Sequence, residues 1–529
     1  MSVSTHDGRD TTRTVTRLET KKSWNTVLVI GVVALAAVIR FWNLGALGYQ
    51  HWDEYFFIRG ALVVSQTWPK GFGSINYVIT PLVPYTAGTL FHFFGVHSWI
   101  PFAVSATYGT LSTLALYVVG SRLFGNAVGL IAAAVLATAE FSVTFSRMAL
   151  ADATFEFWVI ASVLFMWLGF TRRRLGYWVL AGASTGLLMN TKYIGVFPLI
   201  LAVTWLGVEF VVDVVKGRRE FLSKAVSEYL PRVIGVAAMI GVAVLFFAPW
   251  LLKLAHNPGF HDFLAHETAF SHDKTPPNFI IWYYWLWTSP PTVVLAVAGI
   301  AVGLLRFTRA DRLMLIYTAG WFAALLTFDP YPREALSLLP AVGIWAGRAI
   351  VEAWRTIAAS KPRLQPAATA AAAGCVLAVV IVQFLPLPHT LSLRTEGYAD
   401  AGAIAARYQS TGSTLFVRTQ DAAYLYLKGE YILQASPLVV QLLNDKGSTA
   451  VFMTDQTIDW FAQASAFFQL NRDRLEVIAR VPNPLYPEVF LQPATTDKLS
   501  HLDNPPDAYR YITLWRVNGT LLIPPSWPK

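Results

Sequence analysis

Long apolar runs alternate with short polar segments over most of the 529-residue chain. Each run approaches 20 residues, and a helix of that length crosses a bilayer core of about 30 Å. The pattern predicts eleven membrane-spanning helices. We place them at residues 24–42, 98–120, 126–146, 153–170, 176–191, 194–212, 232–252, 286–305, 313–328, 335–351 and 366–387.

The two ends of the chain differ from this apolar part. Residues 1–23 are polar and lead into the first run without a small-residue cleavage site, which predicts a cytoplasmic tail and an uncleaved first helix. After residue 391, helical patterns at 396–409, 437–445 and 457–470 alternate with strand-like segments near 414–418, 450–454, 475–480, 487–491 and 511–516. We therefore expect an all-α membrane domain over 24–391 and a soluble α/β domain over 392–529.

Composition supports the membrane assignment. Apolar residues make up 55% of the chain and charged residues only 14%, whereas soluble domains carry about 25% charged residues. The net charge of +9 resides in short basic clusters between apolar runs, which is typical of membrane orientation and not of a nucleic-acid-binding face. We expect the lipid bilayer as a partner and no nucleic acid. The single cysteine, Cys375, lies in an apolar run, so there is no disulfide framework.

The basic clusters also predict topology. If the N-terminus is cytoplasmic, every dense cluster falls on the cytoplasmic side, as the positive-inside rule requires. These clusters are Lys21–Lys22, Arg122, Arg172–Arg174, Lys216–Arg219, Arg306–Arg312 and Arg355–Arg363. The apolar stretch Tyr77–Val96 would reverse the later clusters if it spanned, so we interpret it as interfacial helices. Loops 44–97 and 254–280 and the C-terminal domain are then extracytoplasmic.

Two adjacent carboxylates, Asp53 and Glu54, follow the first predicted helix within an aromatic segment. Neighbouring residues point about 100° apart on a helix, so they cannot converge on one sugar like the facing pair of a glycosidase. One carboxylate acting as a single base fits them better. A solvated acidic pair that begins a helix is the alternative, and the residues alone leave both interpretations open.

Three cations occupy the outer ends of predicted helices: Arg147, Lys192 and Arg333. Each alone is more often a membrane anchor, and Arg147 could simply pair with Asp152 at the interface. Together, on the same side as the acidic pair, they favour an anion site, because arginine and lysine suit phosphate.

A histidine-rich outer loop contains His256, His261, His266 and His272. Their spacing does not match the i, i+4 pair that places two histidines on one helical face, so a solvated or pH-sensitive loop is favoured over a zinc site. We predict no cofactor. A divalent metal held by His261 and His266 stays open.

The order of these motifs resembles the C-type membrane glycosyltransferases, especially the dolichyl-phosphate-mannose protein mannosyltransferases and the lipid A aminoarabinose transferase. The resemblance covers about residues 39–345. It is carried by Ile39–Leu44, Trp52–Tyr55, Thr80–Leu82, Arg122–Gly125, Ser146–Arg147 with Asp152, Thr191–Lys192, Asn257–Phe260 with Phe263, Glu267 and Phe270, and Pro332–Arg333 with Leu338–Pro340. Two features depart from it. Arg333 stands where the aminoarabinose branch usually has lysine, and the soluble domain that eukaryotic mannosyltransferases insert between helices is absent.

The resemblance implies an inverting transfer of a sugar from a polyprenyl-phosphate donor to a hydroxyl of a protein, glycolipid or cell-wall glycan. Asp53 or Glu54 would be the base, and Arg147, Lys192 and Arg333 would bind the donor phosphate. Asp152, Glu267 and His261 would support them. The site would lie on the extracytoplasmic side of the cell membrane.

The main rival is a transporter or flippase of lipid-linked sugars. Such a protein would place polar residues near helix midpoints and use paired, interrupted helices. The ionisable residues here gather at predicted helix ends. A receptor whose C-terminal domain binds a ligand is a further alternative, but it leaves Asp53 and Glu54 without a role.

Overall fold

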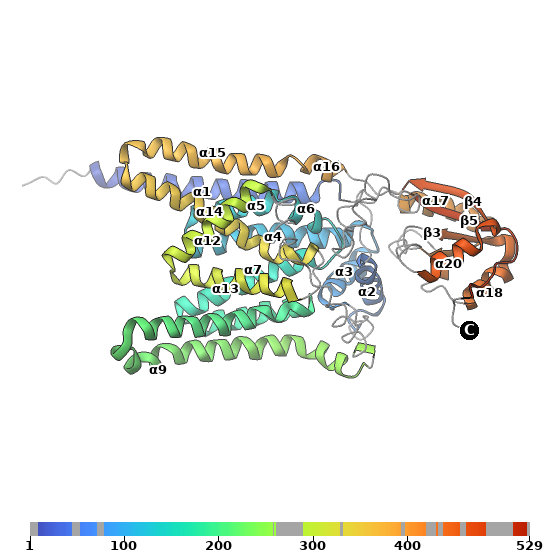
Figure 1. Cartoon of the computed structure of the whole chain (residues 1–529), viewed down its shortest axis with the longest axis horizontal. Coiled ribbons are helices and arrows are strands. Elements are labelled where there is room, and N and C mark those ends of the chain that lie inside the picture. Colours follow the sequence, from blue (N-terminus) through green and yellow to red (C-terminus); the bar gives the residue numbers. More distant parts are fainter. Residues whose placement is uncertain are drawn as a thin grey trace, which may run out of the picture.

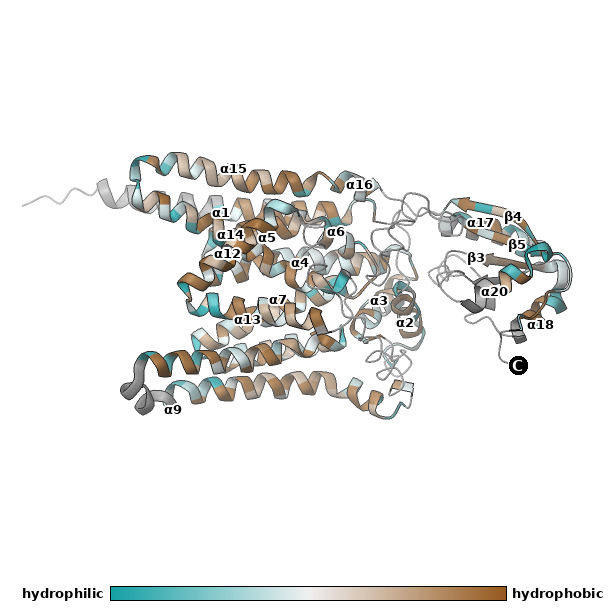
Figure 2. Cartoon of the chain, viewed as in Figure 1, coloured by the Kyte–Doolittle hydropathy of each residue, from teal (hydrophilic) through white to brown (hydrophobic). Residues whose placement is uncertain are grey.

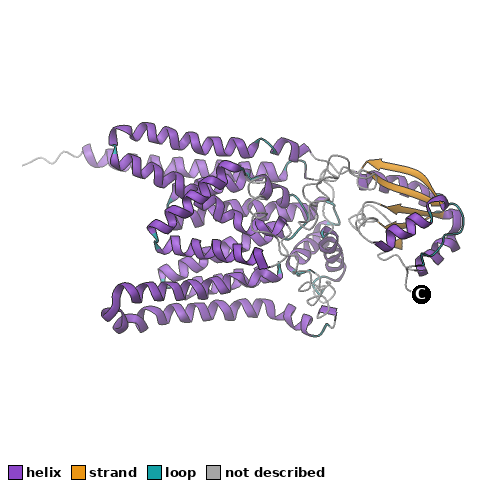
Figure 3. Ribbon diagram, in the orientation of Figure 1, coloured by secondary structure: helices purple, strands orange, loops and turns teal. Residues whose placement is uncertain are grey.

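The protein consists of a helical bundle and a smaller part built around a sheet, which lies beyond one end of the bundle (Figures 1 and 3). We call that end of the bundle the sheet-side end and the opposite one the far end. The computed structural model describes residues 9–44, 53–70, 79–257, 259–260, 289–327, 332–392, 397–418, 430–431, 437–454, 462–482 and 511–525.

Within the described residues, each of the eleven predicted apolar runs is largely helical. The helices of these runs are α1 (Arg9–Phe41), α4 (Trp99–Phe124), α5 (Asn126–Thr138), α6 (Glu140–Ser146), α7 (Asp152–Arg172), α8 (Leu175–Met189), α9 (Phe197–Ala255), α12 (Pro290–Arg306), α13 (Arg309–Thr327), α14 (Leu339–Ser360) and α15 (Gln365–Phe384). Short segments are η3 (Tyr193–Val196), η4 (Pro332–Leu338), η5 (Pro362–Leu364) and α16 (Leu387–Ser392). η3 and α9 together contain two candidate spans, Tyr193–Lys216 and Ser227–Ala255, and Figure 1 shows α9 as two runs alongside each other.

Six helices among the described residues are long and apolar enough to cross a membrane, or seven if α5 and α6 form one span. Hydrophobic residues predominate along the helices of the bundle (Figure 2). Buried tryptophans such as Trp205 and Trp345 fill its interior, while Leu245 and Leu305 are exposed on its surface. Apolar residues exposed in such numbers on long helices require lipid around them. The chain is therefore an integral membrane protein, and the number of eleven crossings stays a prediction.

The predicted span 126–146 is not one straight helix. Its two parts, α5 and α6, meet at Ala139 with a bend of 60°. The last carbonyls of a helix have no partner within it, and inside a membrane such groups need one. Arg40 supplies it: Nη2 donates to the carbonyl of Leu136 at 3.0 Å and Nη1 to that of Ala137 at 3.1 Å. A completely buried arginine of α1 thus caps the end of α5.

Two short helices, α2 (Glu54–Thr67) and α3 (Leu82–Phe94), pack together at the sheet-side end (Figure 1). At 14 and 13 residues they are too short to cross a bilayer. Their contact is close at Gly88, where an added Cβ would lie 2.5 Å from the carbonyl oxygen of Ala61. This agrees with our interpretation of Tyr77–Val96 as something other than a span, although part of that stretch lies outside the described residues.

The C-terminal part contains a five-stranded sheet in the order β2-β1-β3-β5-β4. β1 (Thr414–Arg418) pairs in parallel with β2 (Glu430–Tyr431) and β3 (Ala450–Thr454), while β5 (Tyr511–Val517) lies antiparallel between β3 and β4 (Leu475–Pro482). α17 (Gly397–Ser410) packs on the face of Val451 and Met453, and α18 (Pro437–Lys446) and α20 (Ala462–Leu470) on the face of Ala450 and Phe452. The predicted alternation of helices and strands is observed here. The strand expected at 487–491 lies outside the described residues, and an independent soluble domain over 392–529 stays a prediction.

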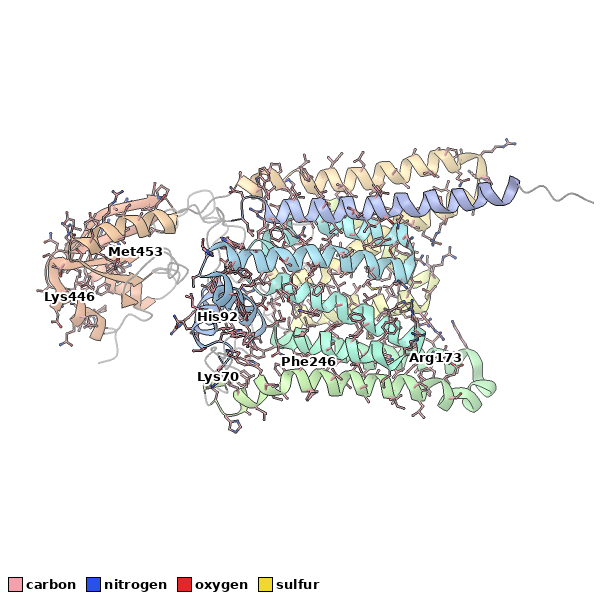
Figure 4. All side chains as sticks on the ribbon, turned by 180° about the vertical axis from the view of Figure 1, so that it is seen from behind. Lys70, His92, Arg173, Phe246, Lys446 and Met453 are labelled. Carbon is pink, nitrogen blue, oxygen red and sulfur yellow. The ribbon has the colours of Figure 1, made fainter. Side chains whose placement is uncertain are left out.

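The described basic clusters meet at the far end of the bundle. Arg173 pairs with Glu228 at 3.7 Å, and Arg309 pairs with Asp213 at 3.3 Å. Figure 4 shows Arg173 at this end and His92 at the other. The one-sided placement of these clusters is thus observed, while its orientation with respect to the cell stays a prediction.

Candidate functional site

Two cations and three carboxylates form a connected network at the sheet-side end. Lys192 Nζ lies 2.7 Å from Asp152 Oδ1 and 2.8 Å from Glu334 Oε1. Arg333 Nη1 lies 2.5 Å from Asp53 Oδ2, and its Nε lies 3.8 Å from the same Glu334 oxygen. A single carboxylate oxygen of Glu334 therefore lies between the two cations.

Four segments that are distant in the sequence bring these side chains together. Asp53 directly precedes α2, and Asp152 begins α7. Lys192 follows α8 in an extended conformation, while Arg333 and Glu334 belong to η4. Carboxylates are favoured at helix N-termini, because the unpaired backbone N–H groups there carry partial positive charge.

The network is shielded from solvent, which strengthens the attraction between its opposite charges. The side chain of Asp152 is only 3% exposed and that of Lys192 16%. Burial alone would lower the pKa of Lys192, but the charges of Asp152 and Glu334 outweigh it, so the pKa lies above the ordinary lysine value. Phe155 lies beneath the ammonium, with its ring centroid 5.6 Å from Nζ. Lys192 is therefore a permanent cation at neutral pH.

Glu54 has a different environment from its neighbour Asp53. Its carboxylate is completely buried and accepts a hydrogen bond from the backbone N–H of Ala149, with an N···O distance of 2.7 Å. Asp53, in contrast, is partly exposed beside Arg333. The acidic pair is thus divided: Glu54 ties the start of α2 to the segment after α6, and Asp53 faces the cations.

Arg147 contacts the end of α1. Its Nη1 donates to the carbonyls of Trp42 at 2.7 Å, Ile39 at 3.0 Å and Arg40 at 3.2 Å. The residue is 1% exposed, and Asp152, which we considered as its partner, pairs with Lys192 instead. The structure therefore groups Lys192 with Arg333 and places Arg147 as a cap on α1.

Arg40 and Arg147 form a pair of arginine caps, because each caps a helix in the other's part of the bundle. Arg40 of α1 caps α5, and Arg147, which follows α6, caps α1. Arg40 Nη2 also donates to Ser142 Oγ at 3.0 Å, and that hydroxyl donates to Glu156 Oε2 at 3.3 Å. Glu156 is buried one turn after Asp152 on α7. The caps therefore join the beginning of α7 to the bend between α5 and α6.

The predicted loop ligands His261, His266 and Glu267 lie outside the described residues, so a metal or supporting role for them stays a prediction. His256 is described, and its ring nitrogen Nδ1 lies 2.7 Å from the carbonyl oxygen of Leu252. Within the described part of the chain, no group of three His, Cys, Asp or Glu residues could hold a metal ion.

Sequence reasoning missed three residues of these networks: Glu334, Arg40 and Glu156. Glu334 had a visible signal, because it directly follows Arg333 and lies in the first turn of η4. Arg40 and Glu156 had none, since their partners are about a hundred residues away or belong to another helix.

Residues 79–252 match the family model of the dolichyl-phosphate-mannose-protein mannosyltransferases. Among solved structures, ArnT from Cupriavidus metallidurans in the apo state is similar, with 16% identity, a TM-score of 0.61, and coverage of 94% of this chain and 99% of ArnT. The same ArnT bound to undecaprenyl phosphate matches with a TM-score of 0.60 and the same identity and coverage.

The Archaeoglobus fulgidus oligosaccharyltransferase in the apo form is also similar, with 14% identity, a TM-score of 0.59, and coverage of 85% of this chain and 71% of the other. A search of curated proteins gives no match. The family resemblance seen in the sequence is thereby confirmed, and the chain has the fold of the C-type membrane glycosyltransferases.

Proposed function

We propose that the protein is an inverting glycosyltransferase that moves a sugar from a polyprenyl-phosphate donor to an acceptor hydroxyl on the extracytoplasmic side of the membrane. The observation that carries this proposal is the position of Asp53 beside Arg333 at one end of a membrane bundle, in a network that Glu334 extends to Lys192. A base in a network with two cations suits displacement of a phosphate. ArnT bound to undecaprenyl phosphate and the archaeal oligosaccharyltransferase bound to dolichol-phosphate support the class of carrier.

The reaction needs few groups because the leaving phosphate is already a stable anion. The acceptor hydroxyl gives its proton to Asp53, its oxygen forms a bond to the anomeric carbon, and the bond from that carbon to the phosphate oxygen breaks. Lys192 and Arg333 stabilise the charge that gathers on the phosphate. Attack from the face opposite the phosphate inverts the anomeric centre. The acceptor is a hydroxyl of a protein, glycolipid or cell-wall glycan.

The network has to rearrange when the donor binds. Its three carboxylates and two cations sum to a charge of −1, which disfavours a further anion. Arg333 can bind the phosphate by exchanging its contact with Asp53 for one with phosphate oxygens. A carboxylate that already accepts a charge-assisted hydrogen bond is a poor proton acceptor. Donor binding therefore frees Asp53 to act as the base.

The activity is tested with purified protein and a panel of short-chain polyprenyl-phosphate sugars, incubated with membranes and followed by mass spectrometry. We expect one donor to release polyprenyl phosphate, in step with the appearance of a glycosylated acceptor. The opposite outcome is that no donor in the panel loses its sugar, and that one donor crosses the bilayer of protein-containing liposomes unchanged. The protein would then be a flippase.

One structural feature favours the alternative function, a transporter of lipid-linked sugars. This feature is the bend between α5 and α6 beside the buried Glu156. Transporters use such interruptions in pairs, one in each half of the fold. Within the described helices this is the one bent pair that could form a span, and its free carbonyls are capped by Arg40. Because a protein contact already occupies these carbonyls, the bend favours the transferase over the transporter.

We predict that Glu54 positions Asp53 and is not itself the base. Glu54→Gln keeps an oxygen that accepts the Ala149 N–H, so transfer should stay within a few-fold of wild type. Glu54→Ala leaves that buried N–H without its partner, so thermal stability and transfer should fall together. Transfer rates per folded molecule and unfolding temperatures decide. A folded Glu54→Gln protein with no activity would make Glu54 the base.

The sidedness of the site is predicted from the basic clusters at the far end. In a Cys375→Ala background, Ser410→Cys in α17 should react with an impermeant thiol reagent in whole cells. Ser360→Cys at the far end of α14 should react only after permeabilisation. Both positions are exposed, so accessibility within the fold is matched. Labelling of Ser360→Cys alone in intact cells would reverse the orientation.

A further inference from the structure

A hollow of about 740 Å³ opens at the far end of the bundle, away from the candidate site. It lies between the turn from α12 to α13 and the second half of α14. Its lining includes Arg306, Arg348, Arg355, Glu352, Thr308 and Ser360. Three guanidinium groups therefore surround one hollow, and the proposed transfer reaction makes no use of them.

The three arginines converge on one carboxylate. Glu352 pairs with Arg306, with Arg348 at 3.4 Å and with Arg355 at 3.9 Å. The charged side chains of the lining thus sum to +2. Each guanidinium has five N–H donors, and Glu352 can satisfy few of them. The hollow therefore holds preassembled cationic donors in excess of its negative charge.

The depth of these groups differs in a way that suits an anion entering from outside. The side chains of Arg306 and Arg355 are 57% and 49% exposed, whereas Arg348 is 7% exposed. Arg348 Nε is buried without a hydrogen bond, 3.5 Å from the buried carboxylate of Asp311. Arg348 also lies over the ring of Phe124, with 4.9 Å between its Cζ and the ring centroid. A fixed cation thus forms the floor, and two solvated ones form the rim.

Exposed apolar residues neighbour the lining arginines in the chain. Leu305, which precedes Arg306, is 86% exposed, and Leu304, Phe307 and Ile357 are exposed as well. In a membrane these side chains face acyl chains. A molecule with an apolar tail along α12 would present its headgroup to Arg306 and Arg355, and phosphate matches the fork geometry of arginine. A free phosphate would make no use of these apolar residues.

We infer that this hollow binds the phosphate headgroup of an anionic phospholipid from the leaflet on that side of the membrane. Basic residues are common at cytoplasmic helix ends and usually remain solvated there. The gathering of these three around a defined hollow, above a buried arginine and beside an exposed apolar surface, distinguishes them from the other clusters.

Native mass spectrometry of the purified full-length protein with added phosphatidylglycerol or phosphatidylcholine tests this site. Replacing Arg306 and Arg355 together by glutamine should weaken phosphatidylglycerol binding roughly tenfold or more, because two charge-assisted contacts are lost. The matched control replaces Arg172 and Arg174, two exposed arginines at the same end, and should bind as wild type. Equal loss in both double variants would reduce the effect to net charge and overturn the proposal.

Two further measurements distinguish a lipid site from a structural ion cluster and from a site for soluble phosphate. Glu352→Gln removes the one carboxylate among the described lining residues, so phosphatidylglycerol binding should strengthen. A purely structural ion cluster would lose stability on this change without binding more lipid. Inorganic phosphate at millimolar concentration should not displace the lipid. Full displacement would make the hollow a site for soluble phosphates, and wild-type binding by the Arg306 and Arg355 double variant would exclude a phosphate site there.

Discussion

Asp53→Asn should lower the rate of sugar transfer by about 10²–10⁴-fold, the usual contribution of a general base. Asparagine keeps the shape of the side chain but cannot take the proton of the acceptor hydroxyl. Donor binding should be maintained or become tighter, because Arg333 loses the carboxylate with which it pairs. The measurement is turnover of a synthetic short-chain donor by detergent-purified protein, beside the dissociation constant of the same donor.

Asp400→Asn is the matched control, since it makes the same change at an exposed position of α17. It should transfer sugar at the wild-type rate. Wild-type turnover by Asp53→Asn would remove Asp53 from the mechanism. Loss of donor binding together with turnover would instead make Asp53 a structural partner of Arg333.

Arg333→Ala should weaken donor binding about 10–100-fold, because a shielded guanidinium–phosphate contact contributes roughly 1.5–3 kcal/mol. Arg333→Lys should retain part of this affinity, since a point charge replaces a bidentate fork. Acceptor affinity should change much less than donor affinity. Titration with a non-reactive polyprenyl phosphate, measured apart from turnover, separates binding from chemistry.

Arg147→Ala provides the comparison that separates a phosphate ligand from a helix cap. Arg147 donates hydrogen bonds to carbonyls at the end of α1. Its removal should therefore lower the unfolding temperature and leave the donor affinity of the folded protein near wild type. A specific loss of donor binding in a stable Arg147→Ala protein would restore it as a phosphate ligand. Unchanged donor binding in Arg333→Ala would make Arg333 a partner of Asp53 only.

The sequence predicted the helices well because apolar runs of membrane length have few competing interpretations. It could not show the bend at Ala139, since residues 126–146 contain no proline and read as a single apolar run. The bend depends on Arg40, whose contacts with Leu136 and Ala137 join distant segments. Local patterns carry no information about such pairings.

The sequence predicted which site residues lie at the same face of the membrane, but not which of them are in contact. Placing Lys192, Arg333 and Asp53 at one membrane face was enough to group them, and the structure does bring them together. The same reasoning included Arg147, which lies at that face but is turned towards α1. Sidedness gives depth along the membrane normal and says nothing about direction within its plane. The division between Asp53 and Glu54 likewise depends on the backbone of Ala149, a tertiary contact.

The exchange of arginine caps between α1 and the α5–α6 segment has a consequence for biogenesis. Arg40 is made 96 and 97 residues before the carbonyls that it caps, and Arg147 appears more than a hundred residues after those of α1. Until α6 emerges from the ribosome, the end of α1 carries a cation without its partners. The most favourable place for this cation during that time is the membrane surface. We therefore expect the first helix to reach its final depth late, when α6 is inserted and both arginines find their carbonyls in one step.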